Sequence, residues 1–258
     1  MIKTKNKPNG FVVLIGLFVL GLAIFSFSTK NSDASEPEYK NTSTIEVSSN
    51  YQVVNGLDEM VNTTGVVVVG SFDKQIDTMN MRRDSKDITK ENKVSYEEGR
   101  VYEFIVEEVL VGKVRDEKIN IALAYSSETV IYDGNGDEVK VQLPNPLFKE
   151  PKRQQKYMLF LYKNNELNMY FKSCEPYRIE IQDGILLSDS VLFEPDNKTS
   201  TLKLEKTKEM ITVDYRIPIG IKDTISGKYF SDVKSEILEL AKHKKQRSSK
   251  FHAPTLFN

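Results

Sequence analysis

Apolar and polar residues alternate most regularly in Val101–Gly112, which reads VYEFIVEEVLVG. From Tyr102 to Val106 every second residue is apolar, as expected for a strand with one buried face. The apolar pattern resumes at Val109–Val111 one residue out of phase, which predicts a β-bulge at Glu107–Glu108. A strand bent in this way can pass from one side of a small closed barrel to the other.

Two further segments are apolar at nearly every position, Val66–Gly70 and Gln155–Tyr162, and should form strands buried on both faces. The polar residues 73–99 form a long excursion or continue the first strand into a hairpin. Residues 195–200 read as a linker. Shorter alternating segments predict strands at 119–123, 129–132, 138–143, 167–171, 177–181, 185–191, 202–204 and 211–217. The fold class is therefore mainly β, built around a small barrel.

Two segments show helical spacing instead. Gly56–Asn62 predicts a short helix, and Ser231 can cap a C-terminal helix that runs to about Gln246. Four apolar residues of the second helix recur at helical spacing and should pack it on the barrel: Phe230, Val233, Ile237 and Leu240.

The N-terminus has the pattern of an export signal. Lysines at positions 3, 5 and 7 precede the uncharged apolar run Phe11–Phe27, which as a helix reaches roughly 26 Å. We expect residues 1–10 to stay in the cytoplasm and 11–27 to be a transmembrane anchor; the alternative is a signal peptide cleaved near Ser26 or Ser28. Residues 28–50 are rich in Ser, Asn, Thr and Glu and predict a flexible linker. The folded domain should then span 51–247, followed by a tail at 248–258.

Composition narrows the class of protein. The formal net charge of −1 gives no electrostatic reason to expect nucleic acid. Cys174 is the single cysteine, so no intrachain disulfide can form, which suits a bacterial envelope better than a disulfide-rich secretome. Only two histidines occur, His243 and His252, both near the C-terminus, and this scarcity disfavours most histidine-dependent mechanisms.

The loop Asp133–Asp137, DGNGD, has two interpretations. Its glycines and asparagine suit a hairpin turn. It also resembles a calcium loop, but position six would be Glu138 instead of glycine and position twelve Pro144 instead of glutamate. The hairpin is the favoured interpretation.

Other candidates for chemistry are weak. Cys174 is expected to be a buried thiol rather than a nucleophile. Glu107 and Glu108 are neighbours in a strand, so their side chains should diverge unless the bulge lies between them. The basic end of the last helix, from Lys242 to Lys250, suits a helix C-terminus or contact with an anionic wall polymer or lipid headgroups. We therefore assign no catalytic, metal-binding or cofactor-binding residue, no cofactor, and no particular binding residue.

Several phrases resemble an uncharacterised family of Gram-positive, membrane-anchored envelope proteins. They are Val53–Gly70, YEFIVEEVLVG at 102–112, QKYMLFL at 155–161 and YRIEIQDG at 177–184, with the terminal helix around Val233–Leu240. The expected strand order is also similar to that of netrin-like modules and the tissue inhibitors of metalloproteinases. This resemblance implies an OB-like barrel. Their inhibition needs an N-terminal cysteine that this chain lacks, so only the fold should carry over.

These observations favour a non-enzymatic binding or sensing module. It would be anchored in the cell membrane by a single helix, with its C-terminal domain outside the cell, or else secreted. Its expected partners are the membrane and a cell-wall polymer or envelope protein, without nucleic acid. The alternatives are a hydrolase acting on the cell wall and a purely structural envelope protein.

Overall fold

The structure, a computed structural model, describes residues 38–48, 52–193, 198–217 and 222–250. The expected membrane anchor at 11–27 lies outside these residues. The described part is mainly β with a C-terminal helix, as predicted. Its elements are β1 (Lys40–Ser48), α1 (Leu57–Thr63), β2 (Val66–Asn80), β3 (Glu97–Val111), β4 (Lys118–Tyr132), β5 (Glu138–Pro144), β6 (Lys156–Asn164), β7 (Met169–Lys172), β8 (Arg178–Gln182), β9 (Ile185–Ser188), the 3-10 turn η1 (Val191–Phe193), β10 (Lys198–Leu204), β11 (Glu209–Arg216) and α2 (Phe230–Lys250).

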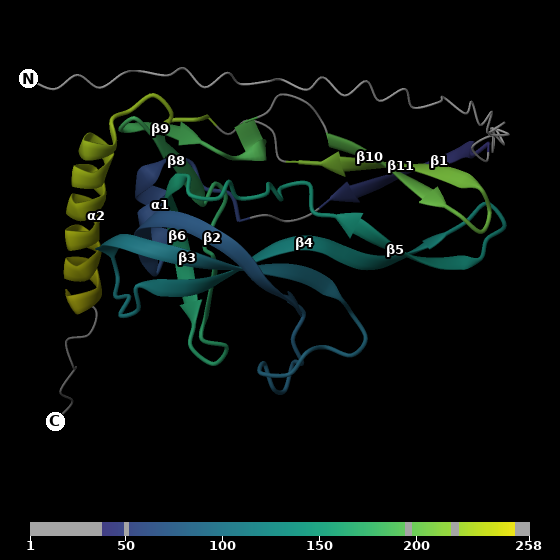
Figure 1. The fold of residues 1–258 in the computed structure, drawn as a ribbon, viewed down its shortest axis with the longest axis horizontal. Helices are drawn as coiled ribbons and strands as arrows, with labels where there is room; N and C mark the ends of the chain where they lie inside the picture. Colours follow the sequence, from purple (N-terminus) through teal and green to yellow (C-terminus); the bar gives the residue numbers. More distant parts are fainter. Residues whose placement is uncertain (1–37, 49–51, 194–197, 218–221, 251–258) are drawn as a thin grey trace, which may run out of the picture. The chain divides into compact units, whose positions relative to one another are not determined.

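The larger sheet has 8 strands, and Figure 1 labels β2, β3, β4 and β6 among them. Its pairings return to their starting point. β2 pairs with β3, β3 with β4, β4 with β7, β7 with β6, and β6 again with β2. The contact between β4 and β7 is parallel and pairs Ile121 with Tyr170, whereas the other pairings are antiparallel. β8 and β9 continue the sheet from β6, and β5 pairs with β4.

One hydrophobic cluster gathers side chains from the strands of this ring of pairings. Phe72 lies at its centre, with its ring 5.0 Å from Phe104 and 5.6 Å from Tyr157, both in edge-on contact. All three side chains are fully buried, and burial of one such side chain stabilises a fold by roughly 1.5–3 kcal/mol. The cluster also contains Val66, Val68, Tyr102, Ile119, Ile121, Leu123, Leu159, Leu161 and Tyr170.

The bulge predicted in β3 is confirmed. Gly70 pairs with Val106 and the next residue back, Val69, pairs with Glu108, so Glu107 is the extra residue. The apolar pattern after it differs from the prediction, because a second shift in register follows and Leu110, not Val109, is buried.

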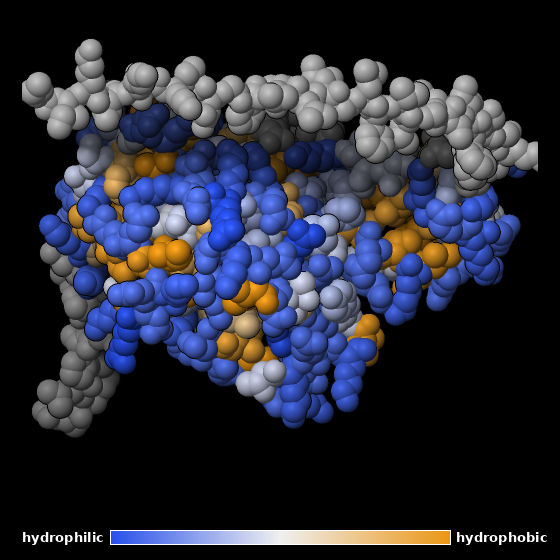
Figure 2. Space-filling model, in the orientation of Figure 1, coloured by the Kyte–Doolittle hydropathy of each residue, from blue (hydrophilic) through white to orange (hydrophobic). Residues whose placement is uncertain are grey.

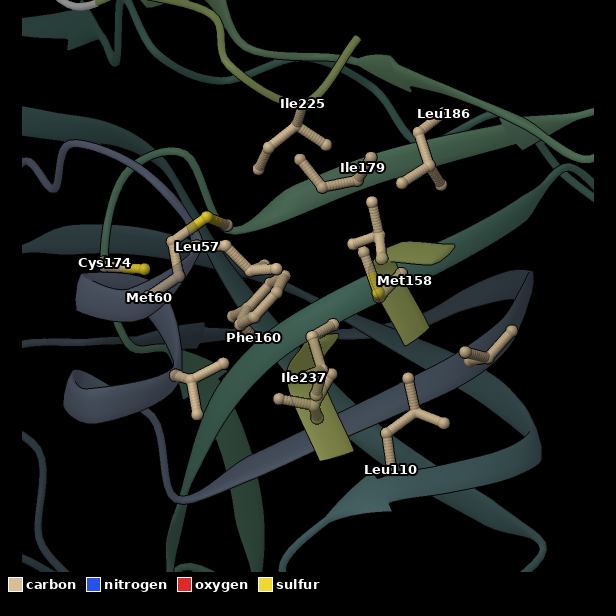
Figure 3. Close-up of a cluster of buried hydrophobic side chains, with 14 of the residues drawn as sticks. Leu57, Met60, Leu110, Met158, Phe160, Cys174, Ile179, Leu186, Ile225 and Ile237 are labelled. Atoms are coloured by element: carbon tan, nitrogen blue, oxygen red, sulfur yellow. The ribbon is translucent and has the colours of Figure 1, made fainter. Parts of the chain in front are cut away.

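The two helices share a second cluster with the sheet (Figure 3). Met60 of α1, Phe160 of β6 and Ile237 of α2 are all fully buried there. Figure 3 also shows Cys174 beside Met60. The prediction that Val233 and Ile237 pack α2 on the sheet is confirmed.

A separate 3-stranded sheet has the order β1–β11–β10. Its apolar side chains, such as Ile211 and Val213, pack against Ile131 and Val141 of β4 and β5. The linker predicted at 28–50 is therefore wrong for Lys40–Ser48, which pair in parallel with β11. Their Ser- and Thr-rich sequence favoured a spacer, but β11 supplies the hydrogen-bonding edge that a short strand needs.

Other segments also test the predicted boundaries. Of the two predictions for residues 73–99, the continuation of the first strand into a hairpin is confirmed: β2 pairs with β3, and only 81–96 lie outside the two strands. The linker expected at 195–200 is wrong for Lys198–Ser200, which begin β10. α2 begins at Phe230, one residue before the predicted cap, and continues to Lys250, past the predicted domain end at 247.

Candidate functional site

A groove between the two sheets arises from small side chains on β4. Ile121 and Leu123 point into the cluster inside the ring of pairings, so Ala122, Ala124 and Ser126 fall on the opposite face. These small side chains do not fill the space in front of the 3-stranded sheet. The space is a cavity of about 480 Å³.

We call this cavity and its continuation the intersheet groove. Val47 of β1 and Tyr215 of β11 contribute from the smaller sheet, and Met81 and Arg82 from the loop after β2. The other lining residues are Glu97, Ala122, Ala124, Ser126, Ser127, Leu143, Pro144, Asn145, Pro146, Tyr162, Phe171 and Lys172.

A second cavity of about 630 Å³ shares Val47, Arg82, Ser127 and Leu143 with the first, so the two adjoin. It follows β4 from Ser127 to Ile131 and is also lined by β1 and the loop residues Ser95 and Tyr96. The groove is therefore elongated, which suits a ligand that is an extended chain.

The charged groups that line the groove are held in ion pairs. Arg82 Nε lies 2.9 Å from Glu97 Oε2, and Lys172 Nζ lies 2.6 Å from Glu175 Oε1. In the second cavity, Glu46 pairs with Arg216 at 2.6 Å and Glu128 with Lys140 at 2.7 Å. Since each lining charge already has a partner, the groove offers no strong net field to an ionic ligand.

Aromatic and hydroxyl groups supply the remaining chemistry. The ring of Tyr162 stacks on Phe171, with centroids 5.5 Å apart and an interplanar angle of 21°. Tyr162 is 45% exposed, so one side of this stack remains open to a ligand. Ser95, Ser127 and Thr129 place hydroxyl groups along the groove. An open aromatic face in one part of the groove and hydroxyl groups along the rest suit binding to a polar polymer or peptide.

Cys174 lies beside the groove and is not activated. A cavity of about 320 Å³ contains Cys174 and Glu175 and shares Tyr162 and Lys172 with the groove. The thiol is 3% exposed, and burial raises its pKa to about 11. Its Sγ donates to the Pro176 carbonyl at 3.4 Å. Burial also raises the pKa of Glu175, although Lys172 opposes that shift. The buried thiol predicted for Cys174 is confirmed, and the thiolate needed for nucleophilic attack is disfavoured.

Glu107 and Glu108 do not form a dyad. Glu107 pairs with Lys156 of β6 at 2.5 Å, whereas Glu108 pairs with Lys234 of α2 at 2.5 Å. The two carboxylates therefore pair with different elements and diverge, even though Glu107 is the bulged residue.

The loop Asp133–Asp137 is a hairpin turn between β4 and β5, as favoured from the sequence. Asp133 Oδ1 accepts the backbone N–H groups of Asn135 and Asp137, each at 2.9 Å. Gly134 N–H donates to Glu209 Oε2 of β11 at 3.1 Å, which ties the hairpin to the smaller sheet. Within the described ranges, no group of three or more His, Cys, Asp or Glu side chains could hold a metal ion.

One lysine of the basic C-terminal end has a structural contact. Lys244 Nζ donates to the carbonyls of Val61 and Thr64, at 3.0 and 2.7 Å, at the end of α1. It therefore stabilises the carbonyl end of that helix.

Sequence reasoning named no residue of the groove as a binding residue. The available signal was the alternation of large and small side chains in Ile121–Ser126, which left one face of a strand lined with small residues. The opposing residues Val47 and Tyr215 carried no such signal, because their position depends on how the two sheets pack.

No protein-family model, curated protein or solved structure matches the chain. Of the helices in the described part, none is long and apolar enough to cross a membrane.

Proposed function

We propose that the ring of β2, β3, β4, β7 and β6 is a closed, OB-like barrel of the netrin-like kind. Two observations support this proposal. The pairings close on themselves, and the link between β4 and β7 is the parallel one. The intersheet groove is lined mainly by β4, the third strand of the ring, with Glu97 at the start of β3 and residues of the loop between the first two strands. OB-like domains bind polymers at this face.

The function proposed for this domain is non-enzymatic binding outside the cell. The elongated groove, with its paired charges, hydroxyl groups and open aromatic stack, is the observation that carries the proposal. It favours an uncharged stretch of a cell-wall glycan over nucleic acid, because phosphates need unpaired Arg and Lys side chains. The apolar, uncharged run Phe11–Phe27 and the lysines before it would anchor the domain as a single-pass membrane protein.

A titration tests this function. Full-length protein in detergent is titrated with N-acetylglucosamine oligosaccharides of increasing length, and binding is followed by calorimetry. We expect affinity to rise with length, because a longer chain fills more of the groove. Absence of binding to any length would contradict the proposed glycan ligand.

Two variants test whether the oligosaccharides bind in the intersheet groove. Ser127→Trp fills the point where the two cavities meet and should weaken binding by roughly tenfold or more, about 1.4 kcal/mol. Thr199→Trp is the matched control, because Thr199 is exposed on β10 and does not line the groove. If Ser127→Trp bound like Thr199→Trp, the groove would not be the binding site.

A further inference from the structure

A cleft separate from the intersheet groove lies between the backbone edges of β5 and β10. Its cavity of about 340 Å³ is lined by Val139–Gln142 and Leu202–Thr207 without a gap in either run. Successive residues of a strand face opposite sides, so a cavity against one face would touch only alternate residues. The cavity contacts every residue of Val139–Gln142 in β5 and of Leu202–Leu204 in β10, which places it along the strand edges, and Glu205–Thr207 of the turn after β10 close one end.

These two edges have no strand beside them in the part of the chain that the structure describes. β5 pairs with β4, and β10 pairs with β11, and neither has a second neighbour there. The edge of a sheet presents N–H and C=O groups that another extended chain can bind. The cleft thus offers main-chain hydrogen bonds to an incoming strand.

The interior of the cleft is apolar. Val139 and Leu202 are half-buried at its mouth, and Val141 and Leu204 lie deeper. Figure 2 shows apolar side chains at the surface over the region where Figure 1 places β5, β10 and β11. An incoming strand with apolar side chains on one face would cover this surface.

The rim of the cleft is basic. Lys140, Lys203 and Lys206 line it together with a single acidic residue, Glu205. Glu205 is already bound by Lys208 Nζ at 2.9 Å and by the hydroxyl of Tyr39. Lys203 Nζ lies over the ring of Tyr39, 5.1 Å from its centroid. The hydrogen bond from Tyr39, the amine of Lys208 and, to a smaller extent, the charge of Lys203 lower the pKa of the Glu205 carboxyl. Among the described carboxylates, none lies within ion-pair distance of Lys203 or Lys206, so an acidic ligand can still pair with both amines.

We propose that this cleft docks an extended acidic peptide, which adds as a strand to the edge of β10. Its apolar residues would cover Val139 and Leu202, and its acidic residues would meet Lys203 and Lys206. A second copy of this chain is a poorer occupant, because its own β10 would bring like charges together. The cleft shares no lining residue with the intersheet groove, so this partner is independent of the proposed glycan.

A pair of synthetic peptides tests the proposal on the full-length protein. One alternates valine with glutamate and the other alternates valine with lysine. We expect the glutamate peptide to bind and to slow the amide hydrogen exchange of β5 and β10, and the lysine peptide to bind at least roughly tenfold more weakly. Equal binding of the two peptides, or protection elsewhere in the chain, would overturn the proposal.

Charge reversal supplies the matched control. Lys203→Glu with Lys206→Glu should abolish binding of the glutamate peptide and leave the melting temperature unchanged. Lys222→Glu with Lys228→Glu makes the same change in net charge at exposed residues away from the cleft, and should leave binding intact. Equal loss in both pairs would show that only net charge matters. Protection of β10 without peptide that rises with protein concentration would assign the edge to a second copy instead.

Discussion

Gly70 provides a direct test of the packing between β2 and β3. It pairs with Val106 on one side and with Tyr157 of β6 on the other, next to the bulge at Glu107. A Cβ atom at this position would lie 1.9 Å from the carbonyl oxygen of Ile105 and 2.8 Å from a ring carbon of Phe104. Gly70→Ala should therefore destabilise the fold strongly, because the nearest atom belongs to a backbone that is itself paired on both sides.

The magnitude follows from opposing contributions. Alanine favours a strand over glycine by roughly 0.5–1 kcal/mol. Overpacking in a core typically costs about 1–3 kcal/mol, and more where backbone has to move. With an overpacking cost near the upper value, we expect a net loss of about 2 kcal/mol in the free energy of unfolding, which corresponds to a melting temperature lower by roughly 4–8 °C for a domain of this size.

Gly65→Ala is the matched control. Neither glycine has a positive φ, and a Cβ at Gly65 would meet its nearest atoms, in Leu161 and Tyr162, at 3.8 Å. Its unfolding free energy should change little or rise by about 0.4–1 kcal/mol. Both variants are compared by thermal and urea unfolding monitored by circular dichroism. Equal melting temperatures for Gly70→Ala and the control would refute the close approach of β2 to β3 at the bulge.

Two further predictions concern buried polar groups. Because the thiol pKa of Cys174 is raised from 9.0 to about 11, the folded state holds this proton longer than the unfolded chain, so stability should fall as pH rises from about 9 to about 11. Cys174→Ser should remove this part of the fall in stability, lower the free energy of unfolding by about 1 kcal/mol at neutral pH, and keep glycan binding. Urea unfolding of both proteins across this pH range measures the difference. An unchanged pH dependence in the variant would contradict the prediction. Asp189 bridges Lys149 and Arg178, each at 2.7 Å, and Arg178 is 3% exposed. Asp189→Asn should therefore lower the free energy of unfolding by about 3–5 kcal/mol, and adding Arg178→Met should restore part of this loss. Additive losses in the double variant would show that the two residues are not coupled.

The sequence alone determined the elements whose type and buried positions follow from the local pattern of apolar residues. Period-two alternation and a phase shift in Val101–Gly112 predicted both β3 and its bulge, because side-chain direction in a strand depends only on position along it. Continuous apolar character predicted the burial of Val66–Val69 and Tyr157–Leu161, and helical spacing placed Val233 and Ile237 against the sheet.

Only the tertiary structure decided the features that join distant segments. Lys40–Ser48 became a strand because β11, far along the chain, provides its hydrogen bonds; the polar sequence by itself indicated a spacer. The intersheet groove needs the small residues of β4 to face Val47 and Tyr215, and the β5–β10 cleft needs two unpaired edges on the same side of the packed sheets. Such surfaces depend on how sheets pack against each other, and sheet packing involves contacts between residues that no local periodicity connects.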